Sequence, residues 1–218
     1  MTLPVVDLYL TDALGQLRIV PVVVIHDAQD AEPLASALKA GGLACAEVTL
    51  RTPAGLESLR RIAVDDQILV GAGTVLRPSQ VDEAVAAGAR FIVTPGFSRA
   101  VVDRCRQLGV PVLPGVTTPS EIQLALDADI AVVKFFPAAA MGGVATLRAL
   151  SPAFPMVRFV PTGGVSADNV RDYLTVPAVL AVGGSWMVAT DLISSGRFDE
   201  IQRRTIEAVA LVSSIEVA

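Results

Sequence analysis

The chain has 218 residues, of which 52% are hydrophobic and 18% charged, with a formal net charge of −5. This apolar content suits one sizeable core and excludes a disordered chain. Nucleic-acid binding is also disfavoured, because the densest basic cluster is only Arg203-Arg204 and no basic block is present.

Short apolar runs rich in Val and Ile recur along the chain at intervals of roughly twenty to twenty-five residues, which is typical of a repeated βα unit. The hydrophobicity within each run is continuous rather than alternating, and this pattern predicts parallel strands covered on both faces. The predicted strands are Ile19–Ile25, Cys45–Leu50, Ile68–Ala72, Arg90–Thr94, Val112–Leu113, Ile130–Phe135, Val157–Val160 and Ala178–Val182.

The segments between these runs carry apolar residues at helical spacing together with helix start and stop signals. Gly41-Gly42 ends the first of them, and Thr118 stands where it can cap another. The predicted helices are Asp30–Ala40, Pro78–Ala87, Ser98–Leu108, Pro119–Leu126, Gly142–Leu150, Ser166–Leu174 and Asp199–Val212.

Alternating strands and helices predict an α/β protein, and eight such units favour a single (β/α)8 TIM barrel that forms one domain over residues 1–218. An open doubly wound sheet is the alternative. Gly71-Ala72-Gly73-Thr74 resembles the start of a dinucleotide-binding loop, but no third glycine follows at the required spacing.

Features that bear on location predict a cytoplasmic protein. Cys45 and Cys105 form no disulfide framework and are expected to be free thiols. The start, Met1 to Asp12, has no positive charge before an apolar run, so it does not resemble a signal peptide. The run Ile19–Ile25 is far below the roughly 18 residues that suggest a membrane span, so no membrane partner is expected.

Lys134 is the most unusual residue of the predicted strands. It follows Ile130-Ala131-Val132-Val133 and precedes two phenylalanines, surroundings in which an unpaired ammonium is unfavourable. Lys39 and Lys134 are the only lysines among 17 lysine and arginine residues. Arginine cannot form an imine, whereas a neutral lysine amine attacks carbonyl groups. Lys134 is therefore a candidate nucleophile, with a structural ion pair or a phosphate contact as the alternative.

Glu47 occupies a similar position in the second predicted strand. Strands two and six lie opposite each other in a ring of eight, and alternate strands contribute to the same interior layer. We therefore expect Glu47 and Lys134 to meet near the barrel axis. Such a carboxylate is a candidate general base, or else an ion-pair partner of Lys134 or Arg51.

Arg51 shares the strand parity of Glu47 and Thr49. Arginine binds carboxylates through two parallel hydrogen bonds, so Arg51 is a candidate clamp for a substrate carboxylate. A salt bridge at the rim of the barrel is the alternative.

Two glycine pairs follow the seventh and eighth predicted strands, where barrels of this kind frequently bind phosphate. Gly163-Gly164 and Gly183-Gly184 would let backbone N–H groups approach phosphate oxygens, and Ser185 adds a hydroxyl. Tight turns without a ligand are the alternative.

The single histidine, His26, is expected at the surface or the edge of the core, and one histidine cannot build a His-rich metal site. Trp186 and Met187 are expected to belong to the core.

Seven short motifs, taken together and in order, resemble those of the 2-keto-3-deoxy-6-phosphogluconate (KDPG) aldolase family, which includes 4-hydroxy-2-oxoglutarate (KHG) aldolase activity. The motifs run over nearly the whole chain: Glu47-Val48-Thr49-Leu50-Arg51-Thr52, Gly71-Ala72-Gly73-Thr74-Val75, Thr94-Pro95-Gly96, Pro114-Gly115, Lys134-Phe135-Phe136-Pro137-Ala138, Pro161-Thr162-Gly163-Gly164 and Gly183-Gly184-Ser185-Trp186.

The resemblance implies a class I aldolase that needs no metal or other cofactor and assembles as a homotrimer. It gives Lys134 the role of Schiff-base lysine and Glu47 that of general acid–base. The implied substrate contacts are Arg51 and Thr74 on the pyruvyl carboxylate, Pro95 and Phe136 around the pyruvyl group, Thr162 near the reacting hydroxyls, and Gly163, Gly164, Gly184 and Ser185 on the phosphate.

The implied reaction cleaves KDPG, a phosphorylated 2-keto-3-deoxy sugar acid, to pyruvate and glyceraldehyde 3-phosphate. Cleavage of 4-hydroxy-2-oxoglutarate to pyruvate and glyoxylate is a further expectation. A KDP-galactonate aldolase, whose substrate differs at one stereocentre, and a non-catalytic barrel that binds a sugar-acid phosphate are the alternatives. The run Ala139-Ala140-Met141 departs from the family pattern, which often has a glutamate followed by a small or polar residue.

Overall fold

The computed structural model describes residues 5–215, and side chains from residue 9 onward. Its strands are β1 (Ile19–Val23), β2 (Cys45–Thr49), β3 (Leu69–Gly73), β4 (Phe91–Val93), β5 (Val112–Leu113), β6 (Gly115–Val116), β7 (Val132–Phe135), β8 (Arg158–Pro161) and β9 (Val182–Gly184). Their residues are almost all buried, as the continuous apolar runs predict.

These strands close into a parallel ring. One sheet has the order β5-β4-β3-β2-β1-β9 and the other the order β6-β7-β8. Two parallel bridges, Phe159 with Val179 and Thr162 with Gly183, join β8 to the segment of β9. β5 and β6 are two halves of one strand interrupted at Pro114, whose carbonyl accepts a hydrogen bond from the Lys134 N–H. The described residues therefore form the predicted (β/α)8 barrel.

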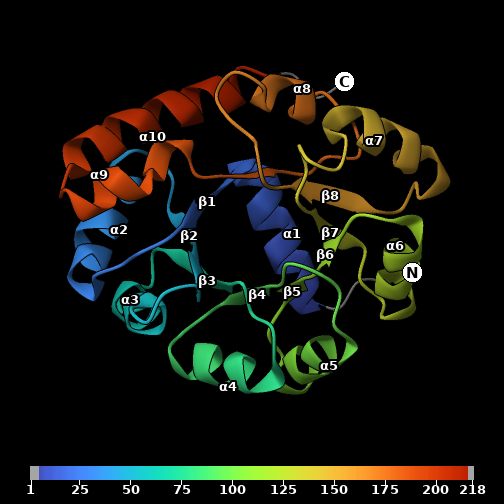
Figure 1. Cartoon of the computed structure of the whole chain (residues 1–218), viewed down its shortest axis with the longest axis horizontal. Coiled ribbons are helices and arrows are strands. Elements are labelled where there is room, and N and C mark those ends of the chain that lie inside the picture. Colours follow the sequence, from blue (N-terminus) through green and yellow to red (C-terminus); the bar gives the residue numbers. More distant parts are fainter. Residues whose placement is uncertain (1–4, 216–218) are drawn as a thin grey trace.

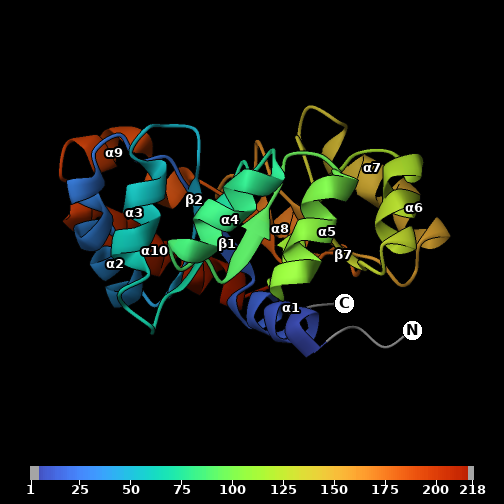
Figure 2. The ribbon, with the colours of Figure 1, turned by 90° about the horizontal axis from the view of Figure 1, so that it is seen from below.

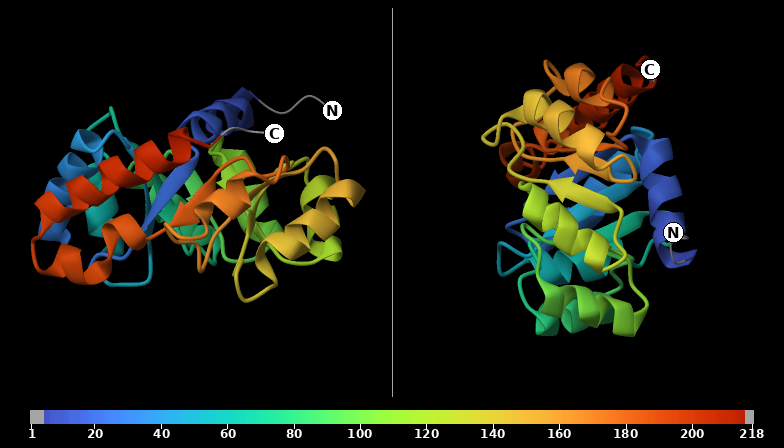
Figure 3. Two further views of the ribbon diagram at one scale, coloured as in Figure 1. Left: turned by 90° about the horizontal axis from the view of Figure 1, so that it is seen from above. Right: turned by 90° about the vertical axis from the view of Figure 1, so that its right-hand side faces the viewer.

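Helices surround this ring on the outside (Figures 1 and 3). The α-helices are α1 (Val5–Leu17), α2 (Ala31–Ala40), α3 (Gly55–Ile62), α4 (Pro78–Ala86), α5 (Arg99–Leu108), α6 (Pro119–Asp127), α7 (Gly143–Leu150), α8 (Val170–Leu174), α9 (Thr190–Ser194) and α10 (Phe198–Ser213). Short 3-10 turns cover Ala28–Asp30, Ser151–Ala153 and Trp186–Val188. No helix of the described residues is long and apolar enough to cross a membrane.

The local start and stop signals act as expected. Thr118 caps α6 and forms a reciprocal capping box with Glu121, and Gly109 ends α5 in the left-handed conformation. α3 was missed by the sequence analysis, although its buried Gly55, Ser58, Leu59 and Ile62 recur at helical spacing. α1 and the short α9 were also missed.

Two predicted elements begin later than expected. The helix predicted over Ser166–Leu174 starts only at Val170, because Ala167–Asn169 form a tighter turn in which the Asn169 N–H donates to the Ser166 carbonyl. The strand predicted over Ala178–Val182 has its ladder at Val182–Gly184, so within the predicted range only Val182 and the bridge at Val179 are paired.

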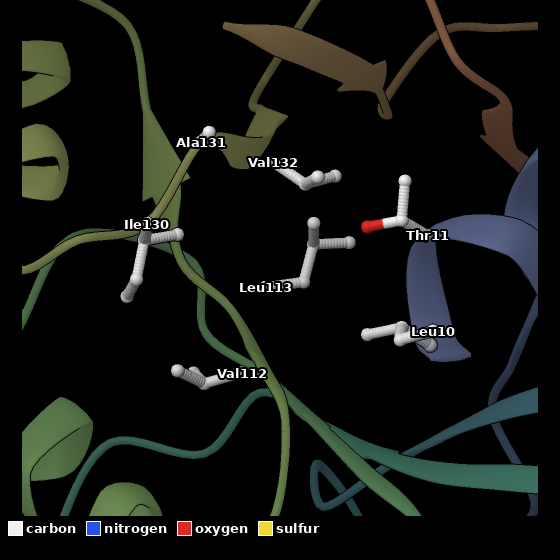
Figure 4. A pocket seen from close by; sticks show the side chains of 7 residues that line it. All are labelled: Leu10, Thr11, Val112, Leu113, Ile130, Ala131 and Val132. Atoms are coloured by element: carbon white, nitrogen blue, oxygen red, sulfur yellow. The ribbon is translucent and has the colours of Figure 1, made fainter. Parts of the chain in front are cut away.

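α1 closes the end of the barrel at which the strands begin. Its Leu10 and Leu14 join an apolar cluster with residues from the first positions of the strands, among them Cys45, Leu69 and Phe91. Figure 2 shows α1 lying across this end of the ring. Figure 4 shows Leu10 and Thr11 of α1 facing Val112, Leu113 and Val132 around a small pocket there. The opposite end, where the strands terminate, remains available for a site.

Candidate active site

Glu47 of β2 and Lys134 of β7 meet inside the barrel. Lys134 Nζ donates to Glu47 Oε1 at 3.0 Å and to Oε2 at 3.3 Å. Their side chains are only 4% and 3% exposed, respectively. The prediction that the side chains of Glu47 and Lys134 meet inside the barrel is therefore confirmed.

Lys134 lies among apolar strand residues, as the sequence predicts, but its amine has a buried polar partner. It is paired with the Glu47 carboxylate, and this pairing offsets the loss of solvation for both groups. The Phe136 ring centroid lies 5.2 Å from Nζ and adds a cation–π contact. Before Lys134 can attack a carbonyl, a proton must leave Nζ, and Glu47 is the adjacent acceptor.

Glycines stand opposite both members of this pair and leave room for neighbouring groups in the same layer. Gly71 is the register partner of Glu47, and Gly115 is the partner of Lys134. A side chain at Gly71 would meet the Phe91 ring, and one at Gly115 would meet the backbone of Pro95. The lower barrel is filled by large apolar side chains, whereas this upper layer combines glycines with polar groups.

Arg51 lies just beyond the end of β2, so the strand-parity argument for it does not apply, because the strand stops at Thr49. Its guanidinium nevertheless points to a neighbour in the predicted site: Nε donates to Thr74 Oγ1 at 3.1 Å. Thr74 has φ 60°, a left-handed conformation that a β-branched residue rarely adopts. Strained backbone of this kind clusters at functional sites in proteins.

A pocket of about 170 Å³ opens beside the pair and contains most of the predicted substrate contacts. It is lined by Val22, Arg51, Phe136, Thr162, Gly163, Gly164, Val165, Gly183, Gly184 and Ser185. Glu47 and Lys134 do not line this pocket themselves, but Val22 is the register partner of Glu47 and the Phe136 ring lies next to Lys134 Nζ. Sequence reasoning missed Val22 and Val165, whose apolar side chains carry no signal that separates them from the core.

The Gly163-Gly164 loop is held in place by contacts from two directions. Both glycines have positive φ, 96° and 79°, which explains why glycine stands there. Asn169 Nδ2 donates to the Gly164 carbonyl at 2.9 Å, and the Ala139 N–H donates to the Gly163 carbonyl at 2.9 Å. Asn169 was missed by the sequence analysis. Its position at the start of a helix is the only local signal, and its bond to Gly164 depends on the turn.

Gly184 and Ser185 lie on the other wall of the same pocket. A Cβ on Gly184 would collide with the Trp186 ring, so this glycine is fixed by packing rather than by a positive φ. Ser185 is exposed and Trp186 is half-buried against the core. Met187 is fully buried, so the prediction that Trp186 and Met187 belong to the core is confirmed.

Pro95 does not line this pocket, but its backbone lies against Gly115 and therefore beside the strand position that pairs with Lys134. Thr94, which the sequence motif includes without a role, holds this junction together by hydrogen bonds. Its hydroxyl donates to the Gly96 carbonyl at 2.7 Å and accepts from the Gly115 N–H at 3.3 Å.

The other residues singled out in the sequence lie away from the pair or form no site. His26 is exposed, and both cysteines are buried and free. Among residues 5–215, no group of three or more His, Cys, Asp or Glu side chains is arranged to hold a metal ion.

The barrel and its buried amine–carboxylate pair define the class of this protein, a Schiff-base aldolase, which is a lyase. Residues 10–204 match the family model described as KDPG and KHG aldolase. The chain is 45% identical over 202 residues to a 2-dehydro-3-deoxy-phosphogluconate aldolase of Treponema pallidum, with 92% of this chain and 96% of the relative covered. It is 44% identical to a KHG/KDPG aldolase of Escherichia coli K12, with 88% and 90% covered.

Among solved structures, a KDPG aldolase of Legionella pneumophila superposes with a TM-score of 0.88 at 41% identity, covering 90% of this chain and 96% of that one. That structure holds pyruvate captured as a covalent carbinolamine intermediate. The chain belongs to the KDPG and KHG aldolase family.

Proposed function

We propose that this chain cleaves KDPG to pyruvate and glyceraldehyde 3-phosphate through a Schiff base on Lys134. The observation that carries the proposal is the buried contact of 3.0 Å between Lys134 Nζ and Glu47 Oε1. It places a potential nucleophile and a proton acceptor together, next to a pocket that contains a cation and two glycine pairs.

The first stage forms the imine. Glu47 accepts the proton of the Lys134 ammonium, and the neutral amine attacks the C2 ketone to give a carbinolamine. Glu47 returns a proton to the C2 hydroxyl, which leaves as water, and a protonated imine remains. This cation can accept the electrons of the bond that breaks next.

The second stage breaks the carbon–carbon bond. Glu47 removes the C4 hydroxyl proton, the C3–C4 electrons move to the imine nitrogen, and the phosphorylated aldehyde leaves. The enamine that remains takes a proton at C3 from Glu47. Water then hydrolyses the protonated imine, with Glu47 accepting a proton from the water and passing it to the departing nitrogen. Pyruvate leaves, and the Lys134 ammonium and the Glu47 carboxylate are restored, so that protons balance over the cycle.

The substrate contacts follow from the shape of the pocket. Arg51, held by Thr74, would bind the carboxylate next to the ketone with two hydrogen bonds. Phe136 and Pro95 would flank the pyruvyl carbons, and Thr162 would contact a hydroxyl of the chain.

The phosphate would lie at the other end of the pocket. There Gly163, Gly164 and Gly184 let the backbone approach the phosphate closely, and Ser185 adds a hydroxyl in the lining of the same pocket.

Cleavage of 4-hydroxy-2-oxoglutarate to pyruvate and glyoxylate is a second activity of the same site. It is supported by the 44% identity to a relative named for both reactions. The pair at Lys134 would act identically, because both substrates carry a C2 ketone and a C4 hydroxyl. The shorter substrate lacks the phosphate, so we expect it to bind more weakly.

The test is a pyruvate-release assay with the purified chain on KDPG, its galactonate epimer and 4-hydroxy-2-oxoglutarate. We expect the highest kcat/KM on KDPG. Faster turnover of the epimer would replace the proposed substrate by 2-keto-3-deoxy-6-phosphogalactonate. Binding of KDPG without any release of pyruvate would identify a non-catalytic sugar-acid barrel instead.

We further propose a single barrel domain over residues 1–218 that works in the cytoplasm as a homotrimer, without a metal, nucleic acid or membrane partner. A solution mass near three chains by light scattering, and full activity after dialysis against EDTA, are the expected results. A fully active monomer would contradict the proposed trimer. Activity that is lost on dialysis and restored by a metal would contradict the proposal that no metal is needed.

A further inference from the structure

Glu47 lies directly over Gly73, the last residue of β3. The backbone partner of Glu47 is Gly71, and Gly73 is two residues further toward the open end of the barrel. The Glu47 side chain therefore leans diagonally across β3. A Cβ built on Gly73 would lie 2.7 Å from Glu47 Cγ and 2.8 Å from Cδ, and Oε1 would be closer still.

The atom that lies over Gly73 is the one that accepts the shorter hydrogen bond from Lys134. Among the described residues, Lys134 Nζ supplies the hydrogen bonds that reach the Glu47 carboxylate. Those bonds change when Nζ becomes an imine nitrogen. After that change, the room above Gly73 still allows the Glu47 carboxylate to stay within reach of the reacting carbons.

We propose that Gly73 is a positioning residue. Because glycine has no side chain, the Glu47 carboxylate can occupy the position above it from which it transfers protons. This inference rests on the proposed aldolase function and deepens it. Gly73 touches no substrate in this account and acts only through Glu47.

The other glycines of the layer show why Gly73 is a suitable position to test. A side chain at Gly115 would meet backbone atoms of Pro95, and one at Gly71 would meet the buried Phe91 ring. Neither neighbour can move easily, so both substitutions are expected to disturb the fold. The three atoms nearest a methyl at Gly73 all belong to the Glu47 side chain, which can rotate, and this β-strand position has no positive φ to strain an alanine.

The experiment compares the wild-type chain with Gly73→Ala. We expect borohydride to trap pyruvate to the wild-type extent but more slowly, a nearly unchanged melting temperature, and a kcat lowered by about 10- to 100-fold because proton transfer is impaired. The exchange of pyruvate methyl protons with deuterated water, which needs the imine and the base but no aldehyde, should fall by the same factor. KM for KDPG should change little, because Gly73 does not bind substrate.

Gly15→Ala in α1 is the matched control. Its added methyl would approach only the Leu180 side chain, at 3.3 Å and far from the open end of the barrel. We expect its kcat and its exchange rate to equal those of the wild type.

A double-variant cycle separates the proposed contact from a general disturbance. Aspartate is one methylene shorter than glutamate and leaves room for the alanine methyl. Glu47→Asp combined with Gly73→Ala should therefore be no slower than Glu47→Asp alone. If the two losses multiply, Gly73 does not act through Glu47.

A folding defect of Gly73→Ala would itself be informative. Adding Gly73→Ala to Glu47→Ala should leave the melting temperature of that variant unchanged, because the clashing side chain is gone. A further loss of stability would place the clash elsewhere and overturn the proposal.

The two proposals also fail in different ways. Normal kcat and exchange in Gly73→Ala, with an active wild type, would overturn the role of Gly73 alone. A wild type that neither traps pyruvate nor cleaves KDPG would overturn the aldolase function, and the role of Gly73 with it.

Discussion

Glu47 and Lys134 are separated by 87 positions in the sequence, yet their side chains form a hydrogen-bonded pair that is almost completely buried. The pair joins β2 to β7 across the barrel. Removing one partner from such a pair leaves a buried charge uncompensated, which typically costs about 3–5 kcal/mol. Variants of these two residues must therefore be judged on stability and on activity separately.

Lys134→Arg separates the charge of this residue from its nucleophilicity. Arginine keeps a cation beside Glu47 but cannot form an imine. We expect the loss of KDPG cleavage to be at least about 10⁴-fold, on the scale seen when a covalent nucleophile is removed. Circular dichroism should show a folded protein. Retention of even a tenth of the wild-type kcat would contradict the role of Lys134.

Glu47→Gln tests the proton-transfer step. The amide can still accept a hydrogen bond from Lys134 Nζ but cannot take up a proton. We expect borohydride still to trap pyruvate on the variant, although more slowly than on the wild type, while kcat falls by about 10²- to 10⁴-fold, the usual contribution of a general acid–base. Turnover at the normal rate would show that another group moves the proton.

Asn169→Ala tests the wall of the pocket assigned to the phosphate. The variant loses the hydrogen bonds that Asn169 makes to the Gly164 carbonyl and the Ser166 N–H. We expect KM for KDPG to rise by about five- to tenfold, the effect of one or two hydrogen bonds. The kcat/KM for 4-hydroxy-2-oxoglutarate, which has no phosphate, should hardly change.

The matched control for this variant is Asp172→Asn, an exposed position on the same helix, α8. It should leave both substrates unaffected. An equal loss on both substrates in Asn169→Ala would show that this loop does not serve the phosphate.

Ser58→Ala should stabilise the protein. Ser58 is completely buried in α3, and its hydroxyl is the buried side-chain group without a hydrogen-bond partner in the described part of the chain. Removing it relieves the desolvation of an unpaired hydroxyl, so we expect the free energy of unfolding in urea to rise by about 1 kcal/mol. Ser36→Ala, at an exposed position in α2, measures the helix-propensity gain together with the loss of one exposed hydrogen bond to the Glu32 carbonyl. A Ser58→Ala variant less stable than Ser36→Ala would indicate a partner for the hydroxyl.

The two thiols predict how stability responds to alkaline pH. Burial raises the pKa of Cys45 to about 12, with the nearby Glu47 charge adding to the effect, and burial also raises the pKa of Cys105 to about 12. The ordinary thiol pKa is 9.0, so the unfolded chain releases these protons first. The thiol contribution to stability is therefore complete below pH 9 and is lost between pH 9 and pH 12.

Urea denaturation at pH 8 and pH 10.5 checks this prediction. We expect the midpoint to fall at the higher pH, and to fall less in a Cys45→Ala, Cys105→Ala variant. Ellman's reagent should react with these thiols at pH 8 only after unfolding. Rapid reaction in the folded state would contradict the assignment.

The sequence was sufficient to predict the barrel and its central pair, because both depend on short-range patterns. Continuous apolar runs marked the strands, and the opposite placement of strands two and six brought Glu47 to Lys134. It was not sufficient where the geometry depends on register or on a loop. The place of Gly73 beneath the Glu47 carboxylate depends on the register of β2 and β3, and the bond from Asn169 to Gly164 depends on the conformation of the loop between them.

The loop after β8 shows the same limit. Ser166 has the local pattern of a helix start, but Ala167–Asn169 form a turn and α8 begins only at Val170.

The most direct measurement of the central claim is borohydride reduction in the presence of pyruvate, followed by peptide mass mapping. The account predicts one stable adduct with the mass of a reduced pyruvyl imine, located on the peptide that contains Lys134. An adduct on Lys39 instead, or no adduct from an active preparation, would contradict it.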